Sequence, residues 1–496
     1  NAFGYLALYS NVVGSNNSAF GHYALYANTT NNNSAFGFSA LQNNTTGGFN
    51  SAFGFNSLAS NTIGSNNNAF GRGSLESNTT GSNNSAFGHY ALYTNTIGAR
   101  NVAVGSRSLR LNTTGNYNTA VGYETLANNT TGQSNSAFGY QALLNNTIGN
   151  YNSAFGYYAL KANTIGVQNT AVGSKALQNN TTDGNSAFGY KALTANTIGT
   201  YNVAVGASSL RSNTTGISNS AFGFSALKYN TIGSNNIAVG VDALYSNTIG
   251  GSNTAVGRTA LGTNTTGSKN NAFGYYALRN NTIGTANSAF GHQALQNNTT
   301  GINNSAFGYQ TLITNTIGTN NTAVGVNSMY YNTTGSSNTA VGRSALQNNT
   351  TGTSNSAFGF YALLSNTTAG VNSAFGYKAL RYNTTGTNNT AIGANSLQNN
   401  TFGGYNAALG RATLFSNTTG IQNVAIGALS LYNNTIGRFN VAVGAYSLYT
   451  NTTGEKNSAF GSYALLNNTV GINNTAVGYQ SLISNTIGNY NSAFGF

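Results

Sequence analysis

The side chains that could catalyse a reaction or bind a metal are few and widely spaced. The chain of 496 residues has 3 His, 5 Asp or Glu and no Cys. His22, His89 and His292 occupy the same place in a repeating sequence, and the first two are four repeats apart. Metal ligands must lie within about 2 Å of the ion, so these histidines cannot share one site. No repeat holds an acidic pair, and no base accompanies the many Ser and Thr residues. We therefore predict no catalytic residue, no metal site and no cofactor, and we predict that the protein is not an enzyme.

Basic and aromatic side chains are the other candidates for chemistry. The formal net charge is +13, with 18 Lys or Arg, and there are 31 Tyr. Arg100, Arg107 and Arg110 form the only local cluster of cations, and Tyr157 and Tyr158 are typical of the tyrosines expected at the surface. Interleaved basic and aromatic groups can bind nucleic acid or an anionic polysaccharide. Because the charges are spread along the chain, we favour a solvated surface, with cell-surface or matrix glycans as candidate ligands and no specific nucleic-acid partner.

Asparagine could also be modified. Asn-x-Ser/Thr triplets recur, as in Asn16-Asn17-Ser18 and Asn44-Thr45-Thr46. Such triplets are acceptor sequences for N-linked glycans. The repeat generates them automatically, so their presence alone leaves both a glycosylated and an unmodified chain open.

All of these side chains are positioned by one short repeat. An Ala, a large apolar residue and Gly first occur as Ala2-Phe3-Gly4, and there are 30 copies; 27 of the 29 intervals are 17 residues long and two are 16. With that Ala as position 0, the unit has Asn at −2, Ser or Thr at −1, Phe or Val at +1, Gly at +2, Leu at +6, Asn at +9, Thr at +10 and Gly at +12. The two short units lose a residue at 31–33 and 183–184, which indicates a loop there.

The repeat predicts the fold class. A unit of 17 residues is too short for a helical hairpin, and Asn, Gly and Thr are poor helix formers. Short β-prone runs separated by Asn and Gly turns favour one coil of a β-solenoid, and the absence of Pro keeps every backbone N–H available. We predict an all-β protein, a parallel β-solenoid or β-roll of about 29 stacked coils, forming a single continuous domain over residues 1–496. No apolar run approaches about 18 residues, so we predict no membrane span.

Comparing the copies with one another indicates which positions face inwards. All 18 Lys and Arg stand at +3, +4, +7, +13 or +14, which we expect in solvent. Phe at +1 accompanies a small residue at −1, as in Ser18 and Phe20, whereas Val at +1 accompanies Val, Thr or Ile, as in Val102 and Val104. Residues two apart on a strand share a face, so this constant combined volume indicates one packed space. We therefore expect −1, +1 and Leu at +6 to form the interior.

The same reasoning places Asn at −2, Ala at 0 and Gly at +2 on the opposite, outward face. Small residues there favour close contact with neighbouring chains, and a trimer is the simplest closed arrangement. A tight bend within one narrow coil is the alternative. In both cases Ala120 and Gly122 have no room for a larger side chain, and we expect them to be critical for assembly. Because Asn recurs in register at −2 and +9, we also expect ladders of stacked amides.

Two units carry a resemblance to a known family: Asn118-Thr119-Ala120-Val121-Gly122-Tyr123 and Asn474-Thr475-Ala476-Val477-Gly478-Tyr479-Gln480-Ser481-Leu482. They resemble the head repeats of trimeric autotransporter adhesins and related repeats of phage and viral tail-fibre-like proteins. The resemblance covers essentially the whole chain and implies a left-handed parallel β-roll, with three chains side by side, displayed outside the cell. The period of 17 residues is longer than that of the commonest adhesin head repeat, and no segment corresponds to that family's stalk, neck or membrane anchor.

These features predict a non-enzymatic structural fibre, extracellular or on the cell surface: an adhesin-like rod or surface filament. The expected partners are further copies of the chain, side by side and end to end, because the ends of a solenoid expose unpaired strand edges. Ice binding is an alternative, since Thr at +10 recurs regularly; +11 alternates between Thr and Ile, which we take as a sign of partial burial. A phage or viral tail-fibre shaft is another. Any ligand should contact the variable positions +3, +4, +7, +8, +13 and +14.

Overall fold

A computed structural model describes all 496 residues and contains strands, turns and bends but no helix. It has 30 strands, which are three residues long except for the two-residue β1. The chain divides into two compact units, Asn1–Ile249 with strands β1–β15 and Gly250–Phe496 with strands β16–β30. Because the chain has no helix, it has none that is long and apolar enough to cross a membrane.

In the first unit the strands are β1 (Ala2–Phe3), β2 (Ser18–Phe20), β3 (Ser34–Phe36), β4 (Ser51–Phe53), β5 (Asn68–Phe70), β6 (Ser85–Phe87), β7 (Val102–Val104), β8 (Thr119–Val121), β9 (Ser136–Phe138), β10 (Ser153–Phe155), β11 (Thr170–Val172), β12 (Ser186–Phe188), β13 (Val203–Val205), β14 (Ser220–Phe222) and β15 (Ile237–Val239). In the second unit they are β16 (Thr254–Val256), β17 (Asn271–Phe273), β18 (Ser288–Phe290), β19 (Ser305–Phe307), β20 (Thr322–Val324), β21 (Thr339–Val341), β22 (Ser356–Phe358), β23 (Ser373–Phe375), β24 (Thr390–Ile392), β25 (Ala407–Leu409), β26 (Val424–Ile426), β27 (Val441–Val443), β28 (Ser458–Phe460), β29 (Thr475–Val477) and β30 (Ser492–Phe494).

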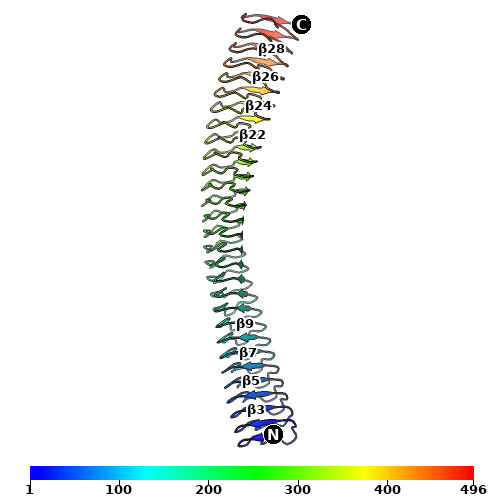
Figure 1. Cartoon of the computed structure of the whole chain (residues 1–496), viewed down its shortest axis with the longest axis vertical. Coiled ribbons are helices and arrows are strands. Elements are labelled where there is room, and N and C mark those ends of the chain that lie inside the picture. Colours follow the sequence, from blue (N-terminus) through cyan, green and yellow to red (C-terminus); the bar gives the residue numbers. More distant parts are fainter. The chain divides into compact units, whose positions relative to one another are not determined.

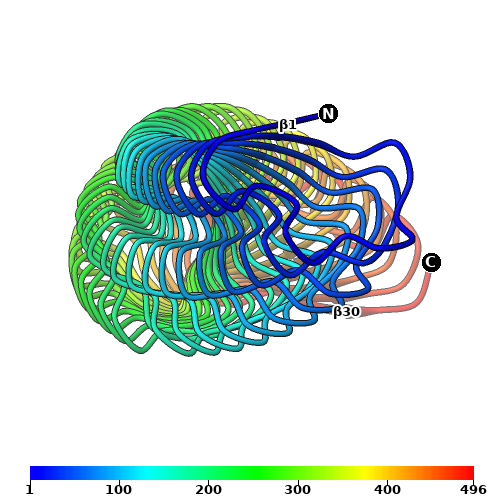
Figure 2. The same cartoon turned by 90° about the horizontal axis from the view of Figure 1, so that it is seen from below.

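Within each unit, every strand pairs in parallel with the strand one repeat later, and equivalent residues lie opposite each other (Figure 1). Phe20 of β2 lies opposite Phe36 of β3, and their rings stack with centroids 4.8 Å apart and planes 8° apart. Viewed along the stack, neighbouring coils follow nearly the same path and turn gradually relative to one another (Figure 2). The predicted all-β parallel solenoid, with one repeat per coil, is therefore confirmed.

The turns of each coil require left-handed backbone at fixed positions. In one coil of the first unit, Glu124 at +4 has φ 49°, Leu126 at +6 has φ 54° and Ser134 at +14 has φ 56°, and these positions have positive φ throughout the chain. β-Branched side chains rarely adopt this conformation. Only Thr259 and Val371 do so here. This requirement explains why +6 is filled by Leu and not by Val or Ile.

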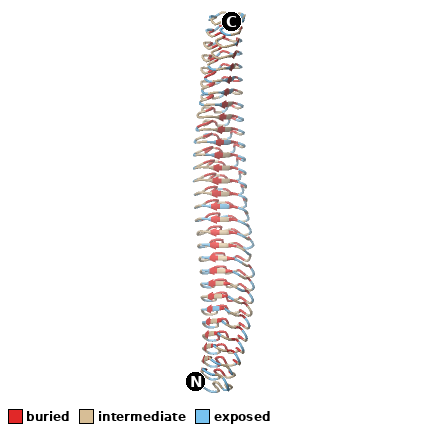
Figure 3. Ribbon diagram, turned by 90° about the vertical axis from the view of Figure 1, so that its right-hand side faces the viewer, coloured by how far each residue is buried: buried red, intermediate tan, exposed pale blue.

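The buried interior forms a stripe along each unit (Figure 3). It is built from Asn at −2, Ala at 0, a small residue at +5, Leu at +6 and Asn at +9. In the coil that contains β8 these are Asn118, Ala120, Thr125, Leu126 and Asn129, all fully buried. The expectation that Leu at +6 lies inside is confirmed.

The placement of positions −1 and +1 in the interior is wrong. Phe20 is 40% exposed and Val104 is 37% exposed, whereas Ala19 and Ala103 beside them are fully buried. Strand alternation puts −1 and +1 on one face, as expected, but that face points outward. The coil is narrow, and the Leu at +6 occupies the space behind the strand, so only Ala fits at position 0. We call positions −1 and +1 of all strands the outer sheet face.

Ala120 and Gly122 have no room for a larger side chain, as expected, but the crowding comes from their own chain. Ala120 is fully buried inside the coil. A Cβ on Gly122 would clash with the carbonyl oxygen of Gly139 in the next coil. The argument that these small columns face outward against a neighbouring chain is therefore wrong. The alternative, one narrow coil, accounts for both columns.

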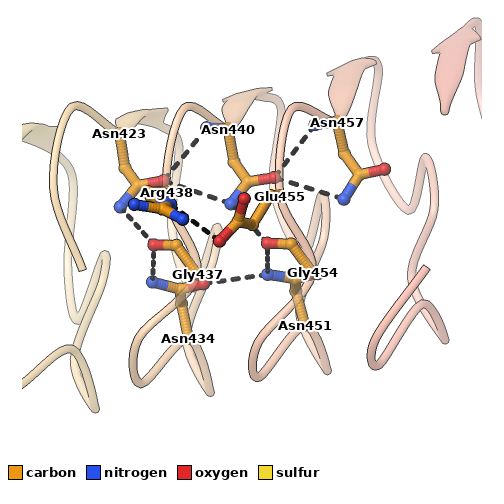
Figure 4. Close-up of polar contacts among 9 residues, drawn as sticks. All are labelled: Asn423, Asn434, Gly437, Arg438, Asn440, Asn451, Gly454, Glu455 and Asn457. Carbon is orange, nitrogen blue, oxygen red and sulfur yellow. Dashed lines mark hydrogen bonds and ion pairs between the residues drawn. The ribbon is translucent and has the colours of Figure 1, made fainter. Parts of the chain in front are cut away.

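Two ladders of asparagine amides hold the coils together, as expected (Figure 4). The backbone N–H of Asn440 donates to Asn423 Oδ1 at 3.0 Å, and Asn440 Nδ2 donates to Asn423 Oδ1 at 3.2 Å and to the Gly454 carbonyl at 2.8 Å. Asn451 Nδ2 donates to Asn434 Oδ1 at 2.8 Å and to the same Gly454 carbonyl at 3.1 Å. The carbonyl at +12 thus joins the −2 and +9 ladders. Buried amides are tolerated because their polar groups are paired.

The repeat shortened at 31–33 keeps both ladders, whereas the repeat shortened at 183–184 keeps the −2 ladder but breaks the +9 ladder, because Asn180 Nδ2 donates only to the Thr182 carbonyl and Asn163 Oδ1 is left without a partner. The Asn33 backbone N–H donates to Asn17 Oδ1 at 2.9 Å, and Asn44 Nδ2 donates to Asn28 Oδ1 at 2.7 Å. The carbonyl of Thr30 takes the place of the usual Gly carbonyl and accepts from Asn28 Nδ2 at 2.8 Å. The missing residue therefore comes from the turn between the two asparagines, where the sequence places a loop.

Candidate interaction surface

On the outer sheet face, the +1 column is an apolar stripe that the single chain leaves partly exposed. Phe188 of the first unit is 41% exposed, and Phe375 of the second is 39% exposed. No charged residue occurs at −1 or +1 in any of the 30 copies. Where Phe occurs at +1 in neighbouring coils, the rings stack with centroids 4.6–5.0 Å apart, except at the first coil, where Phe3 and Phe20 are tilted and 6.5 Å apart. Extended apolar surface of this kind marks contact sites in soluble proteins.

The size matching between −1 and +1 occurs on this exposed face. Ser136 accompanies Phe138 in β9, and Val203 accompanies Val205 in β13. The interior of the coil cannot impose this matching, because neither position is buried there. The constraint therefore acts at the surface, where it keeps the combined size of the two side chains similar from coil to coil.

The two tyrosines expected at the surface lie there within an aromatic cluster. The rings of Tyr157 and Tyr158 have centroids 3.9 Å apart, and Tyr140 of the preceding coil stacks on Tyr157 at 5.5 Å. Lys161 Nζ lies 4.0 Å from the Tyr158 ring centroid, within cation–π range. Hydrogen bonding to Tyr158, followed by burial, raises the pKa of Tyr157. The Tyr157 phenol is therefore neutral near neutral pH, and the cluster offers aromatic and hydroxyl groups together with one cation.

The structure brings two of the three clustered arginines together. Arg107 and Arg110 line a polar hollow of about 320 Å³ with Glu124. Arg100 does not line it; its guanidinium lies 5.2 Å from the Tyr117 ring centroid and donates to the Tyr117 hydroxyl. Arg100 is therefore separate from the pair.

Arg107 is neutralised by a neighbour, which leaves Arg110 as the cation of the hollow. Arg107 Nη1 lies 3.0 Å from Glu124 Oε1, and Gln141 Nε2 donates to Glu124 Oε2 at 2.8 Å. The hydrogen bond to Glu124 raises the pKa of Arg107. Burial opposes ionisation of Glu124, but the hydrogen bonds from Gln141 and Arg107 outweigh it and lower the pKa of this carboxyl. The hollow could hold one anionic group of a ligand.

The three histidines lie at the surface, where His22 and His292 each contact rings of both neighbouring coils and His89 contacts only Tyr90 of its own coil. His292 stacks between Tyr275 and Tyr309, with centroid distances of 5.2 Å and 5.3 Å. The chain contains no group of three or more His, Asp, Glu or Cys side chains that could hold a metal ion.

The structure separates two kinds of glycosylation sequence. Asn44 is fully buried, and its Nδ2 donates to Asn28 Oδ1 and to the Gly47 carbonyl at 2.7 Å and 2.8 Å. That nitrogen cannot carry a glycan in the folded chain. Asn16 stands at +14, is exposed and has φ 60°. Of the two triplets, only the one that begins with Asn16 is accessible in the folded state.

The threonine column at +10 is tied to the scaffold. Thr62 Oγ1 donates to the Thr79 carbonyl of the next coil at 3.0 Å, and this bond recurs along both units. The interpretation of +11 as partly buried is wrong, because Ile63 is 54% exposed. Positions +10 and +11 sit at a turn, where the side chain at +11 points away from the coil.

No protein-family model matches this chain, and no curated protein is similar to it in sequence. Two features were missed by sequence reasoning: the outward orientation of −1 and +1, and the left-handed backbone at +4, +6 and +14. The second leaves a signal in the sequence, namely the near absence of Val, Ile and Thr from three otherwise different columns.

Proposed function

We propose that this chain is a non-enzymatic structural filament protein that works outside the cell or on its surface as an adhesin-like rod. The observation that carries the proposal is the outer sheet face, which has no charge and presents a partly exposed apolar side chain at +1 in every repeat. The fixed residues support the same role. They are committed to amide ladders and to a small interior, and so maintain a regular scaffold.

We infer that the outer sheet face associates with further copies of this chain. Covering half-exposed Phe and Val side chains contributes about 25 cal/mol for each Å² of apolar surface removed from water. A partner stays in register over many coils only if its side chains have the same axial spacing, and a second copy has it. The constant combined size of −1 and +1 gives the face an even height for close packing.

The charges do not oppose this association directly. All Lys and Arg stand at +3, +4, +7, +13 or +14, outside the outer sheet face. Copies that meet through −1 and +1 therefore keep their cations towards solvent. Three copies around one axis would close the arrangement, as the resemblance to trimeric adhesin heads implies.

Mass measurement on matched lysine variants tests this proposal. Phe53→Lys with Phe87→Lys places two charges on the outer sheet face, and Ala59→Lys with Tyr93→Lys places two charges at +7 of the same coils. We expect the native chain and the +7 variant to sediment as the same oligomer, and the outer-face variant to dissociate. A native chain that remains monomeric over the accessible concentration range would contradict the proposal.

The variable positions supply any contact with other molecules. Tyr157, Tyr158 and the hollow beside Arg110 offer aromatic and cationic groups suited to cell-surface or matrix glycans. Arg110→Ala should weaken binding to an anionic polysaccharide and leave the oligomeric mass unchanged. A phage or viral tail-fibre shaft would use the same scaffold in the same way.

Ice binding remains a second candidate, because positions +10 and +11 both reach the surface in every coil. The +10 hydroxyls already donate to backbone carbonyls, and +11 alternates between Thr and Ile, so the surface is not a uniform hydroxyl array. Thermal hysteresis of the purified chain decides between the two functions.

A further inference from the structure

Two tyrosines from neighbouring coils of the first unit meet through their hydroxyl groups. Tyr229 stands at +8 of one coil and Tyr245 at +7 of the next. The Tyr245 hydroxyl donates to Tyr229 Oη at 3.5 Å, and the ring centroids lie 5.0 Å apart with planes at 90°. The ortho carbons of each ring are bonded to the carbon that carries the hydroxyl. The contact between the hydroxyls therefore brings ortho carbons of the two rings near each other.

A lysine completes the cluster. Lys228 Nζ donates to Tyr245 Oη at 3.3 Å and lies 5.1 Å from the centroid of each of the two rings. The hydrogen bond from Tyr245, followed by the charge of Lys228, lowers the pKa of Tyr229. A phenolate loses an electron more readily than a phenol. Oxidation of the pair should therefore begin at Tyr229.

The composition of the chain directs oxidation to tyrosine. Thiols and thioethers are the side chains that oxidants usually attack first. This chain has no Cys and no Trp, and its one Met, Met329, is fully buried. Exposed phenols are then the most readily oxidised groups, and Tyr229 is 43% exposed.

We propose that Tyr229 and Tyr245 form a site of oxidative cross-linking, at which a peroxide acting through a peroxidase joins the two rings as dityrosine. Each phenol loses one electron and one proton, and the two phenoxyl radicals form a carbon–carbon bond between ortho carbons. The hydrogens on those carbons then move to the oxygens as protons, which restores both aromatic rings. One hydrogen peroxide takes up the two electrons and two released protons and leaves as two water molecules.

The product would be a covalent link between adjacent coils in a chain that has no cysteine for a disulfide. Stacked tyrosines elsewhere provide an internal comparison. Tyr432 and Tyr449 of the second unit have centroids 5.3 Å apart, but their planes are 14° apart and the rings lie one above the other. Rings in that arrangement must tilt before their ortho carbons can meet.

The experiment treats the full chain, in dilute solution, with hydrogen peroxide and a peroxidase, and maps cross-linked peptides by mass spectrometry after digestion. We expect a 229–245 link, with the loss of two hydrogen atoms, to be several-fold more abundant than a 432–449 link. Tyr229→Phe should abolish the first link and leave the second unchanged. Lys228→Gln should slow the first link near neutral pH, because Tyr229 then loses the neighbouring charge that favours its phenolate.

Two results would overturn the proposal. One is a 229–245 link no more abundant than the 432–449 link in the folded chain. The other is an equal yield of the 229–245 link from chain unfolded in denaturant, because the yield would then not depend on the folded contact. An unchanged rate in Lys228→Gln would overturn the assignment of Tyr229 as the residue at which oxidation begins.

Discussion

The two faces of the same short strand obey different rules. The inner face carries Ala at position 0 in every copy, and the outer face carries Phe, Val, Ile or Leu at +1 with a size-matched residue at −1. Inside the coil there is so little space that position 0 accepts only Ala. Outside, size varies from coil to coil, but charge is excluded. In this chain uniformity marks the interior, whereas compensated variation in size marks the exposed face that we propose as a contact surface.

The strongest test of this difference compares two adjacent residues. Gly122→Val should destabilise its coil by about 3 kcal/mol or more, since Val would combine a strained φ with a clash against the next coil. The causes are the positive φ of 133° and the Gly139 carbonyl oxygen, which occupies the space that a Cβ on Gly122 would need. Tyr123→Val, one residue away at +3, is the control and should cost less than about 0.5 kcal/mol. Hydrogen exchange of the coil measures both, and similar losses would contradict the distinction between the enclosed column at +2 and the exposed column at +3.

A second test compares two neighbouring asparagines. Asn129 at +9 donates to Asn112 Oδ1 at 2.7 Å and accepts from Asn146 Nδ2 at 2.9 Å. Asn129→Ala leaves buried partners unpaired and should cost about 2 kcal/mol. Asn128→Ala removes a half-buried surface contact to Asn145 and should cost less than about 0.5 kcal/mol. Proteolysis rates at the affected coil report the difference; equal rates would mean that the ladder adds nothing.

The third test concerns backbone conformation at the interior leucine. Leu126 has φ 54°, and Met329 occupies the equivalent position with φ 49°. Leu126→Ile retains the apolar volume but adds a branch at Cβ, and should cost about 1–2 kcal/mol. Leu126→Met should be milder, because an unbranched residue tolerates the same φ. Hydrogen exchange distinguishes the two variants, and an Ile variant as stable as the Met variant would show that φ does not select Leu.

The sequence was sufficient for the fold but not for the direction in which the strand faces. The period, the missing Pro and the Asn columns lead directly to a parallel solenoid with amide ladders. The pairing of Ser136 with Phe138 indicates that the two side chains share a face. However, the same matching of side-chain size is expected whether that face packs against the interior of the coil or against another molecule. Only the width of the coil decides between them, and that width depends on how Leu126 lies behind Ala120. The left-handed turns were detectable from the missing β-branched residues at +4, +6 and +14.

Among the candidate contact residues, the arginines show a different limit. Arg107 and Arg110 are close in sequence and line the same hollow, whereas Arg100 belongs to another turn of the preceding coil. Sequence proximity does not reveal which corner of the coil a residue occupies. The position of a residue within the repeat does reveal its corner, because +14 (Arg100) and +4 (Arg107) belong to separate turns of the coil. The partner of Arg107 likewise stands in the next coil at the same column, a spacing that the repeat makes predictable.

The smallest effect is expected on the outer surface, where Arg107 and Glu124 join adjacent coils at 3.0 Å. Exposed ion pairs contribute little to stability, so Glu124→Gln should change the thermal midpoint less than the three inner variants do. Because the pKa of Glu124 in the folded chain lies below its ordinary value of 4.5, the ionised carboxylate stabilises the fold fully above that value. This contribution disappears as the pH falls through the lowered pKa. A titration of native and Glu124→Gln chains should therefore show a small difference near neutral pH that vanishes in acid. A difference that grows on acidification would mean that the carboxyl is stabilised in its protonated form, which would reverse the role assigned to Gln141 and Arg107.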